Sequence, residues 1–164
     1  MRNFILLLIL LLPSIAAAQE NPATHASGQP VPRFATLKAE KIFARAGPDQ
    51  KYPITWVYQK PGLPIEIVQE YDAWRKIRDE QGGEGWVHKA LLSGKRAVLI
   101  ESKTEVTLKD AADPKARVMA KVEPHVVAQL LKCSPTWCRV EADGYKGWVE
   151  RNLLWGIYPT EELN

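Results

Sequence analysis

The sequence has few of the residues that carry metal or nucleophile chemistry. It contains two cysteines, three histidines and two methionines in 164 residues. The histidines, His25, His88 and His125, stand at no metal-ligand spacing from one another or from a cysteine. None belongs to a known nucleophile motif, and acid pairs such as Asp79-Glu80 lie in highly charged loops, where a solvated position is the default. The sequence therefore predicts no metal, no cofactor and no catalytic set.

The sequence also has no block of like charge and no basic tail. The formal net charge is +3, from 22 basic and 19 acidic residues, and it falls to +2 if Arg2 leaves with a signal peptide. Nucleic acids and anionic membranes attract proteins through clustered basic residues. This mild balance therefore points to neither kind of partner.

The sequence has one long apolar run, at the N-terminus, and none after residue 18. Phe4–Leu12 follows the positive charge of Arg2, is short for a membrane span and ends before a run of small alanines. We predict a signal peptide over residues 1–18, cleaved between Ala18 and Gln19, with an uncleaved anchor as the alternative. The expected location is periplasmic or secreted, with no membrane span after cleavage.

One motif occurs twice. Gly85–Leu92 reads GWVHKALL and Gly147–Leu154 reads GWVERNLL, with their tryptophans 148 − 86 = 62 residues apart. A further tryptophan precedes each copy by 12 and 11 residues, Trp74 before Trp86 and Trp137 before Trp148. Such a repeat indicates two small domains in tandem.

Composition divides the chain into five parts. Residues 19–33 are rich in Pro, Gly and Ser and are expected to form a flexible linker. The two domains are expected at 34–95 and 96–158, followed by a polar tail at 159–164. Domains of about 60 residues lie near the lower size limit for a self-sufficient core, so each would gain by packing against the other.

The segments between the turns are typical of strands. Tyr52–Tyr58 is rich in aromatic and β-branched residues, Pro64–Glu70 alternates in part, and Lys60–Leu63 between them has turn composition. No stretch after residue 20 shows a long helical period. Short strands at close spacing predict an all-β protein of two small barrels.

The two cysteines, Cys133 and Cys138, fall at the end of one predicted strand and the start of the next. Their spacing is not that of a thiol oxidoreductase, and two thiolates with no nearby histidine make a poor zinc site. Opposed residues of a short hairpin lie within disulfide range, and an exported chain meets an oxidising compartment. We predict a structural disulfide. Because the loop that it closes is short, the loss of chain entropy in the unfolded state stabilises the fold by only about 2 kcal/mol.

Several segments of the first repeat together resemble the bacterial SH3-like domains of exported proteins. These segments are 44–48 (ARAGP), 52–53 (YP), 62–67 (GLPIEI), 74–78 (WRKIR) and 85–87 (GWV). The resemblance extends over residues 34–158, although in the second repeat Leu108–Ala111 replaces the Arg-x-Gly-Pro element. It implies a barrel of five or six strands per repeat and a binding module. Related domains are often attached to cell-wall hydrolases and bind peptidoglycan or its peptides.

The resemblance gives candidate ligand-binding residues. Trp74 and Trp137 are similar in position to the tryptophan that borders the ligand groove of SH3-like barrels, although each could instead cover the core. Tyr52, Trp56 and Tyr58 form an aromatic cluster that is either a ledge for a sugar or peptide, or part of the core.

Trp86 and Trp148 follow the glycine of each GWV motif. Because Val87 and Val149 should point inward, strand alternation directs the two tryptophans to the opposite face. There they would be half-exposed or would form the contact between the barrels, and two small cores favour the contact.

Two functional hypotheses follow. The first is a non-catalytic envelope module that recognises peptidoglycan, a wall peptide or an envelope protein through an aromatic groove. The second is a structural or regulatory adaptor whose barrels form one rigid unit without a small-ligand site. A third hypothesis, an enzymatic function, is supported only by the general rule that fold does not determine function.

Overall fold

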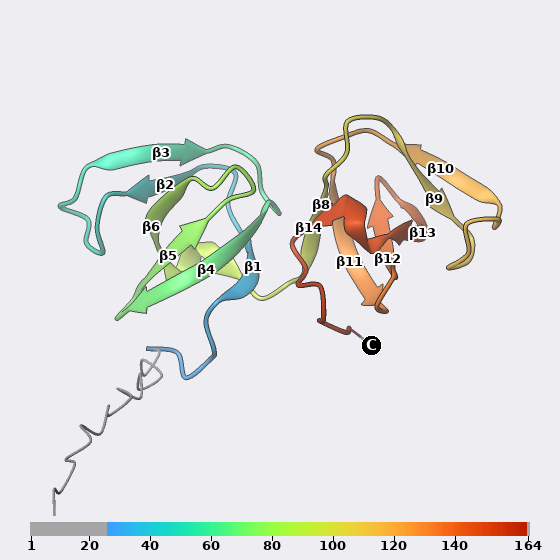
Figure 1. Cartoon of the computed structure of the whole chain (residues 1–164). Helices are drawn as coiled ribbons and strands as arrows, with labels where there is room; N and C mark the ends of the chain where they lie inside the picture. The colour runs from blue at the N-terminus through green and yellow to red at the C-terminus, as the bar shows by residue number, and fades with distance from the viewer. Residues whose placement is uncertain (1–25, 164) are drawn as a thin grey trace, which may run out of the picture.

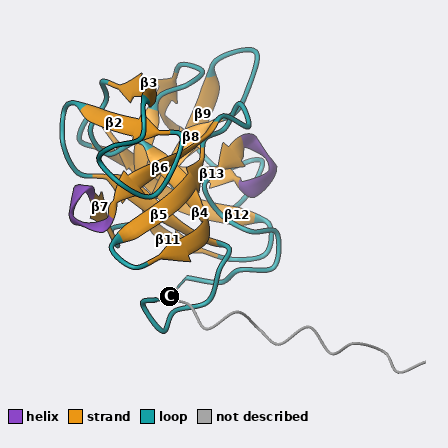
Figure 2. Ribbon diagram, turned by 90° about the vertical axis from the view of Figure 1, so that its left-hand side faces the viewer, coloured by secondary structure: helices purple, strands orange, loops and turns teal. Residues whose placement is uncertain are grey.

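The computed structural model describes residues 26–163, and nearly all of the ribbon is strand or loop (Figures 1 and 2). The predicted signal peptide, with its cleavage site at Ala18 and Gln19, lies outside the described residues. Within residues 26–163, no helix has the length and apolar composition needed to cross a bilayer.

The first barrel is a seven-stranded antiparallel sheet with the order β3-β2-β6-β5-β4-β1-β7. Its elements are β1 (Arg33–Leu37), β2 (Ile42–Arg45), β3 (Ile54–Tyr58), β4 (Pro64–Tyr71), β5 (Trp74–Arg78), β6 (Glu84–His88), the 3-10 turn η1 (Lys89–Leu91) and β7 (Leu92–Ser93).

The second barrel repeats this plan strand by strand, in the order β10-β9-β13-β12-β11-β8-β14. Its elements are β8 (Ala97–Ile100), β9 (Val106–Lys109), β10 (Val118–Val122), β11 (Val127–Cys133), β12 (Trp137–Ala142), β13 (Tyr145–Glu150), η2 (Arg151–Leu153) and β14 (Leu154–Trp155). The predicted all-β fold of two tandem SH3-like barrels is confirmed, and Figure 1 shows the barrels side by side.

Each barrel has its own apolar core. Alternating strand residues point inward and are almost fully buried, including Leu37, Ile42, Ile65, Ile77 and Val87 in the first barrel and Val98, Ile100, Leu108, Val140 and Val149 in the second. The two GWV valines are thus core residues, as predicted. Their tryptophans point to the opposite face of the sheet.

The glycine of each GWV motif lets two strands approach closely. A Cβ added at Gly147 would lie 2.7 Å from Leu108 Cβ and 3.1 Å from the Lys109 carbonyl oxygen, and one added at Gly85 would lie 2.8 Å from Ala44 Cβ. The close approach of β13 to β9, and of β6 to β2, therefore requires glycine in both repeats.

We expect Gly147→Ala to lower the free energy of unfolding by about 1–3 kcal/mol, because the new methyl group overpacks the core. Urea denaturation followed by circular dichroism measures the change. Gly94→Ala is the matched control, since a Cβ there meets nothing within 4 Å, and it should change stability by about 0.5 kcal/mol or less. Equal stability of the two variants would contradict the packing argument.

The predicted disulfide is confirmed. Cys133 and Cys138 are bonded, and their Cα atoms lie 4.1 Å apart as directly paired residues of β11 and β12. Glu70 and Arg75 occupy the corresponding positions of β4 and β5, with the same bulge in the register before them. There Arg75 Nε lies 3.0 Å from Glu70 Oε1, and the glutamate side chain is fully buried. A covalent bond in one barrel thus takes the place of a buried ion pair in the other.

Both terminal segments attach at these cross-links. Ser27 donates two hydrogen bonds of 2.8 Å to Glu70, and Arg33 forms an ion pair of 2.5 Å with it. At the other end, Leu163 forms an isolated bridge with Cys133. The described part of the predicted flexible linker and the predicted tail are therefore held against the barrels, because buried partners at strand ends satisfy their polar groups.

The barrels meet through aromatic side chains from β1 and from the end of the chain. The Phe34 ring packs edge-on against Trp155 at 5.2 Å and lies 4.7 Å from the Tyr158 ring, and Arg96 lies over it at 5.8 Å. The Tyr158 hydroxyl donates a hydrogen bond of 2.7 Å to Glu66 of β4. Burial, followed by this hydrogen bond, raises the pKa of Tyr158.

The sequence left Trp86 and Trp148 two alternatives, a half-exposed position or the contact between the barrels, and favoured the contact. Among residues 26–163, the aromatic pairs that join the barrels include neither Trp86 nor Trp148. The barrels meet on the side of β1 and β4, where β4 contacts β8, whereas β6 and β13 lie farther along their sheets, next to β2 and β9. Trp86 is instead 8% exposed, and Trp148 is half-buried.

Candidate functional site

Trp74 lines a groove on the outer face of the first barrel. The groove has a volume of about 230 Å³ and is formed by Lys41, Phe43, Arg45, Gln50, Trp74, His88 and Leu91. Phe43 and Arg45 alternate on β2, so their side chains share one face of that strand. Trp74 pairs with His88 across β5 and β6, and their rings meet edge-on at 5.7 Å. We call this surface the Trp74 groove.

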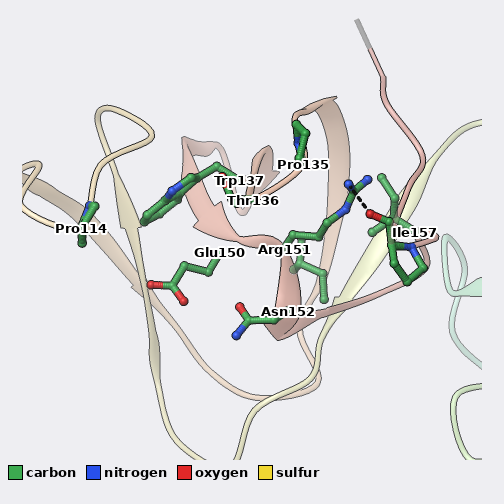
Figure 3. A pocket seen from close by; sticks show the side chains of 10 residues that line it. Pro114, Pro135, Thr136, Trp137, Glu150, Arg151, Asn152 and Ile157 are labelled. Carbon is green, nitrogen blue, oxygen red and sulfur yellow. Dashed lines mark hydrogen bonds between the residues drawn. The ribbon is translucent and has the colours of Figure 1, made fainter.

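Trp137, the equivalent residue of the second barrel, also lines a groove (Figure 3), which is formed by the turn before β12, by η2 and by the end of the chain. Its volume is about 610 Å³, and its lining residues are Pro114, Pro135, Thr136, Trp137, Glu150, Arg151, Asn152, Leu154, Ile157 and Pro159. Trp137 pairs with Glu150 across β12 and β13, just as Trp74 pairs with His88. We call it the Trp137 groove.

Arg151 forms part of the wall of the Trp137 groove and holds the chain end there. It is buried and donates a hydrogen bond of 2.9 Å to the Pro159 carbonyl oxygen and another to the Glu161 carbonyl oxygen. Burial by itself raises the pKa of Glu161, but the hydrogen bond and charge of Arg96 outweigh it and keep the pKa below its ordinary value. Pro159 is therefore held in the wall of this groove by the hydrogen bonds of Arg151.

Trp56 and Tyr58 lie by a different groove, of about 290 Å³, together with Thr55, Asp79, Gln81, Gly83 and Glu84. Trp56 is 60% exposed, whereas Tyr58 is 6% exposed and belongs to the core. The Tyr58 hydroxyl donates to Asp79 Oδ2 at 3.0 Å, and burial followed by the Asp79 charge raises the pKa of this phenol. The predicted aromatic cluster is thus divided between surface and core.

Tyr52 packs on the loop that precedes β3. Its ring lies so close to Gly47 that a Cβ there would be 2.7 Å away, and Lys51 Nζ lies 5.8 Å from the ring centre. Arg45 donates a hydrogen bond of 2.8 Å to the Tyr52 carbonyl oxygen, which fixes this loop beside the Trp74 groove. The four candidate residues therefore do not share one groove. Trp74 and Trp137 occupy equivalent strand positions in two grooves, and Trp56 lies at a third.

Sequence reasoning missed the basic side of the Trp74 groove. Phe43 and Arg45 come from β2 and Lys41 directly precedes that strand, and Arg45 reaches the groove because it pairs with Trp86 of β6. The sequence predicted no role for His88, although its ring contacts that of Trp74. The alternation of Lys41, Phe43 and Arg45 was the available signal, but its meaning depends on which strand lies next to β2.

The fold defines the protein as a tandem pair of SH3-like barrels. A family model described as bacterial SH3 domain matches residues 38–94 and 102–156, and the chain belongs to this family. No curated protein matches the chain at a significant level.

Among solved structures, the chain is similar to NlpC2 from Trichomonas vaginalis, at 13% identity and a TM-score of 0.36, over 79% of this chain and 50% of that one. It is also similar to NlpC1 from Trichomonas vaginalis, at 13% identity and a TM-score of 0.34, over 77% of this chain and 46% of that one. The chain thus spans about half the length of these proteins.

Proposed function

We propose that this protein is a non-catalytic binding module of the cell envelope that recognises peptidoglycan or its peptides through its tryptophan grooves. The observation that carries the proposal is the repetition of one tryptophan position, which borders a groove in each barrel. Trp74 and Trp137 open equivalent strands, and each lines a groove of its own barrel. Trp56, in contrast, has no aromatic counterpart, since Ala120 takes its place opposite Leu108 in β10.

The family and the cysteine pair support this proposal. Bacterial SH3 domains are binding domains commonly associated with the cell wall. A structural disulfide is compatible with an oxidising compartment. Together with the predicted signal peptide, these features support a periplasmic or secreted location.

A pull-down on purified peptidoglycan tests the proposal. We expect Trp74→Ala and Trp137→Ala each to weaken binding roughly thirtyfold, as expected for loss of a tryptophan worth about 2 kcal/mol at the centre of an interface. Trp56→Ala is the matched control and should bind like the unmodified protein. Circular dichroism verifies that each variant is folded.

No binding by the unmodified protein, or full binding by both groove variants, would contradict the wall-binding function. The adaptor would then be the better candidate. The specific observation in its favour is the contact of Phe34 with Trp155 and Tyr158, which joins the two barrels.

A further inference from the structure

The two tryptophan grooves differ in charge although each is bordered by the tryptophan that opens the equivalent strand. The Trp74 groove is lined by Lys41, Arg45 and His88, and its lining contains no carboxylate. In the Trp137 groove, Glu150 takes the position of His88, and prolines form much of the remaining wall. The first groove therefore carries only cationic and neutral polar side chains, which attract an anionic group, whereas the second sets the carboxylate of Glu150 beside the guanidinium of Arg151.

The polar side chains around the Trp74 groove are almost all hydrogen-bond donors. Lysine, arginine and the tryptophan indole can only donate. His88 uses Nδ1 to accept the backbone N–H of Ala90 at 3.3 Å, so the N–H of its neutral ring is on Nε2. Gln50 is the one lining side chain that can also accept. Such a set of hydrogen-bond donors matches a carboxylate, because an ionised carboxylate can only accept hydrogen bonds.

The apolar part of the groove narrows the choice of ligand. Phe43, Trp74 and Leu91 provide hydrophobic walls beside the cations, and Lys41 Nζ lies 5.3 Å from the Phe43 ring centre. Small apolar side chains next to a carboxylate are found at the C-terminal end of a peptide. A volume of about 230 Å³ suits such an end rather than a folded partner.

We infer that the Trp74 groove binds the terminal carboxylate of a peptide with small apolar side chains. The inference rests on the proposed function and names the ligand of that site. Lys41, Arg45 and the Nε2–H of His88 hold the carboxylate, while Trp74 and Phe43 contact the last side chain. Arg45 is already oriented by its bond to the Tyr52 carbonyl oxygen. Lys76, farther along the same strand as Trp74, is neutralised by Glu84 at 2.5 Å.

The probe for this inference is acetyl-Ala-Ala with a free carboxylate, compared with its C-terminal carboxamide. Titration is followed by NMR at the indole N–H of Trp74. We expect the carboxamide to bind at least tenfold more weakly, because it loses the charge-assisted hydrogen bonds. Inorganic phosphate, the other acceptor-only anion, should bind more weakly than the peptide acid because it lacks the apolar part.

Exchanging the two equivalent residues gives a matched pair of variants. His88→Glu places in the first barrel the residue that the second barrel has there, so the fold should tolerate it, and peptide-acid binding should fall at least tenfold. Glu150→His makes the reverse change outside the Trp74 groove and should leave the titration at Trp74 unchanged.

Equal binding of acid and carboxamide, or full binding by His88→Glu, would overturn the inference. Phosphate binding that the peptide acid cannot displace would also overturn it. These outcomes are separable from the wall pull-down. If the protein binds peptidoglycan but does not prefer the acid to the carboxamide, the carboxylate inference is wrong and the wall-binding function stands. Peptide-acid binding without peptidoglycan binding removes only the wall-binding function.

Discussion

Replacing Arg75 with methionine is expected to lower the free energy of unfolding by about 1.5–3 kcal/mol, the range for loss of one hydrogen-bonded partner of a charged group. The change removes one of the two cationic partners of a fully buried carboxylate, because the side chain of Glu70 is 0% exposed and that of Arg75 only 6%. Breaking a buried ion pair from one side is costly because the remaining charge stays in a poorly solvated place. Arg33 still pairs with Glu70 at 2.5 Å, so the carboxylate keeps one cation and the loss stays below that of a wholly unpaired buried charge.

Urea denaturation measures this loss, and Arg139→Met is the matched control. Arg139 lies on β12 with its side chain exposed, so the same chemical change should alter stability by about 0.5 kcal/mol or less. If Arg75→Met were as stable as Arg139→Met, the ion pair would contribute little, and the anchoring of residues 27–33 would need another cause.

The same cluster makes stability depend on pH in a defined direction. Burial by itself raises the pKa of Glu70, but hydrogen bonds from Arg33 and Ser27 outweigh it and lower the pKa from 4.5 to about 2. A carboxyl group whose pKa is lower in the folded state stabilises the fold above its unfolded value. This contribution is therefore present above about pH 4.5 and is lost as the pH falls towards 2, and Glu70→Gln should remove that part of the acid dependence.

The Glu70–Arg75 pair also shows where sequence reasoning stopped. Cys133 and Cys138 could be paired from the sequence because two cysteines flanking a short turn have few alternatives. Glu70 and Arg75 flank the same turn of the first repeat, yet charged residues near a turn are usually solvated. Only the register across β4 and β5 places them opposite each other in the positions of the cysteines.

The tryptophan grooves, like the cross-links, were predictable only in part. The motif spacing located Trp74 and Trp137 at equivalent places, because both open the strand that pairs with the one carrying GWV. The alternation of Trp86 with Val87 was also read correctly. The neighbours of Trp86 could not be predicted from the sequence, because Arg45 and Lys76 flank it from two strands that lie far apart along the chain. The basic side of the Trp74 groove depends on the same pairing.

The contact between the barrels is the other feature that local sequence does not reveal. Phe34 stands at the start of β1 and Tyr158 beyond β14, in segments that composition assigned to a domain edge. They meet because β1 faces the end of the second barrel. Glu66 strengthens the contact, since it accepts from Tyr158 and also from Arg78 Nε at 3.0 Å.

We therefore expect Phe34→Ala to separate the unfolding of the two barrels. Truncating a packed phenylalanine costs about 3–5 kcal/mol when it is fully buried, and about half of that is reasonable for half-buried Phe34. Because small domains are marginal alone, calorimetry should show one transition in the unmodified protein and two in the variant. Phe43→Ala is the matched control, since Phe43 is 39% exposed on the first barrel and outside the contact. A single unshifted transition in Phe34→Ala would mean that the aromatic contact does not couple the barrels, and the rigid adaptor would lose its support.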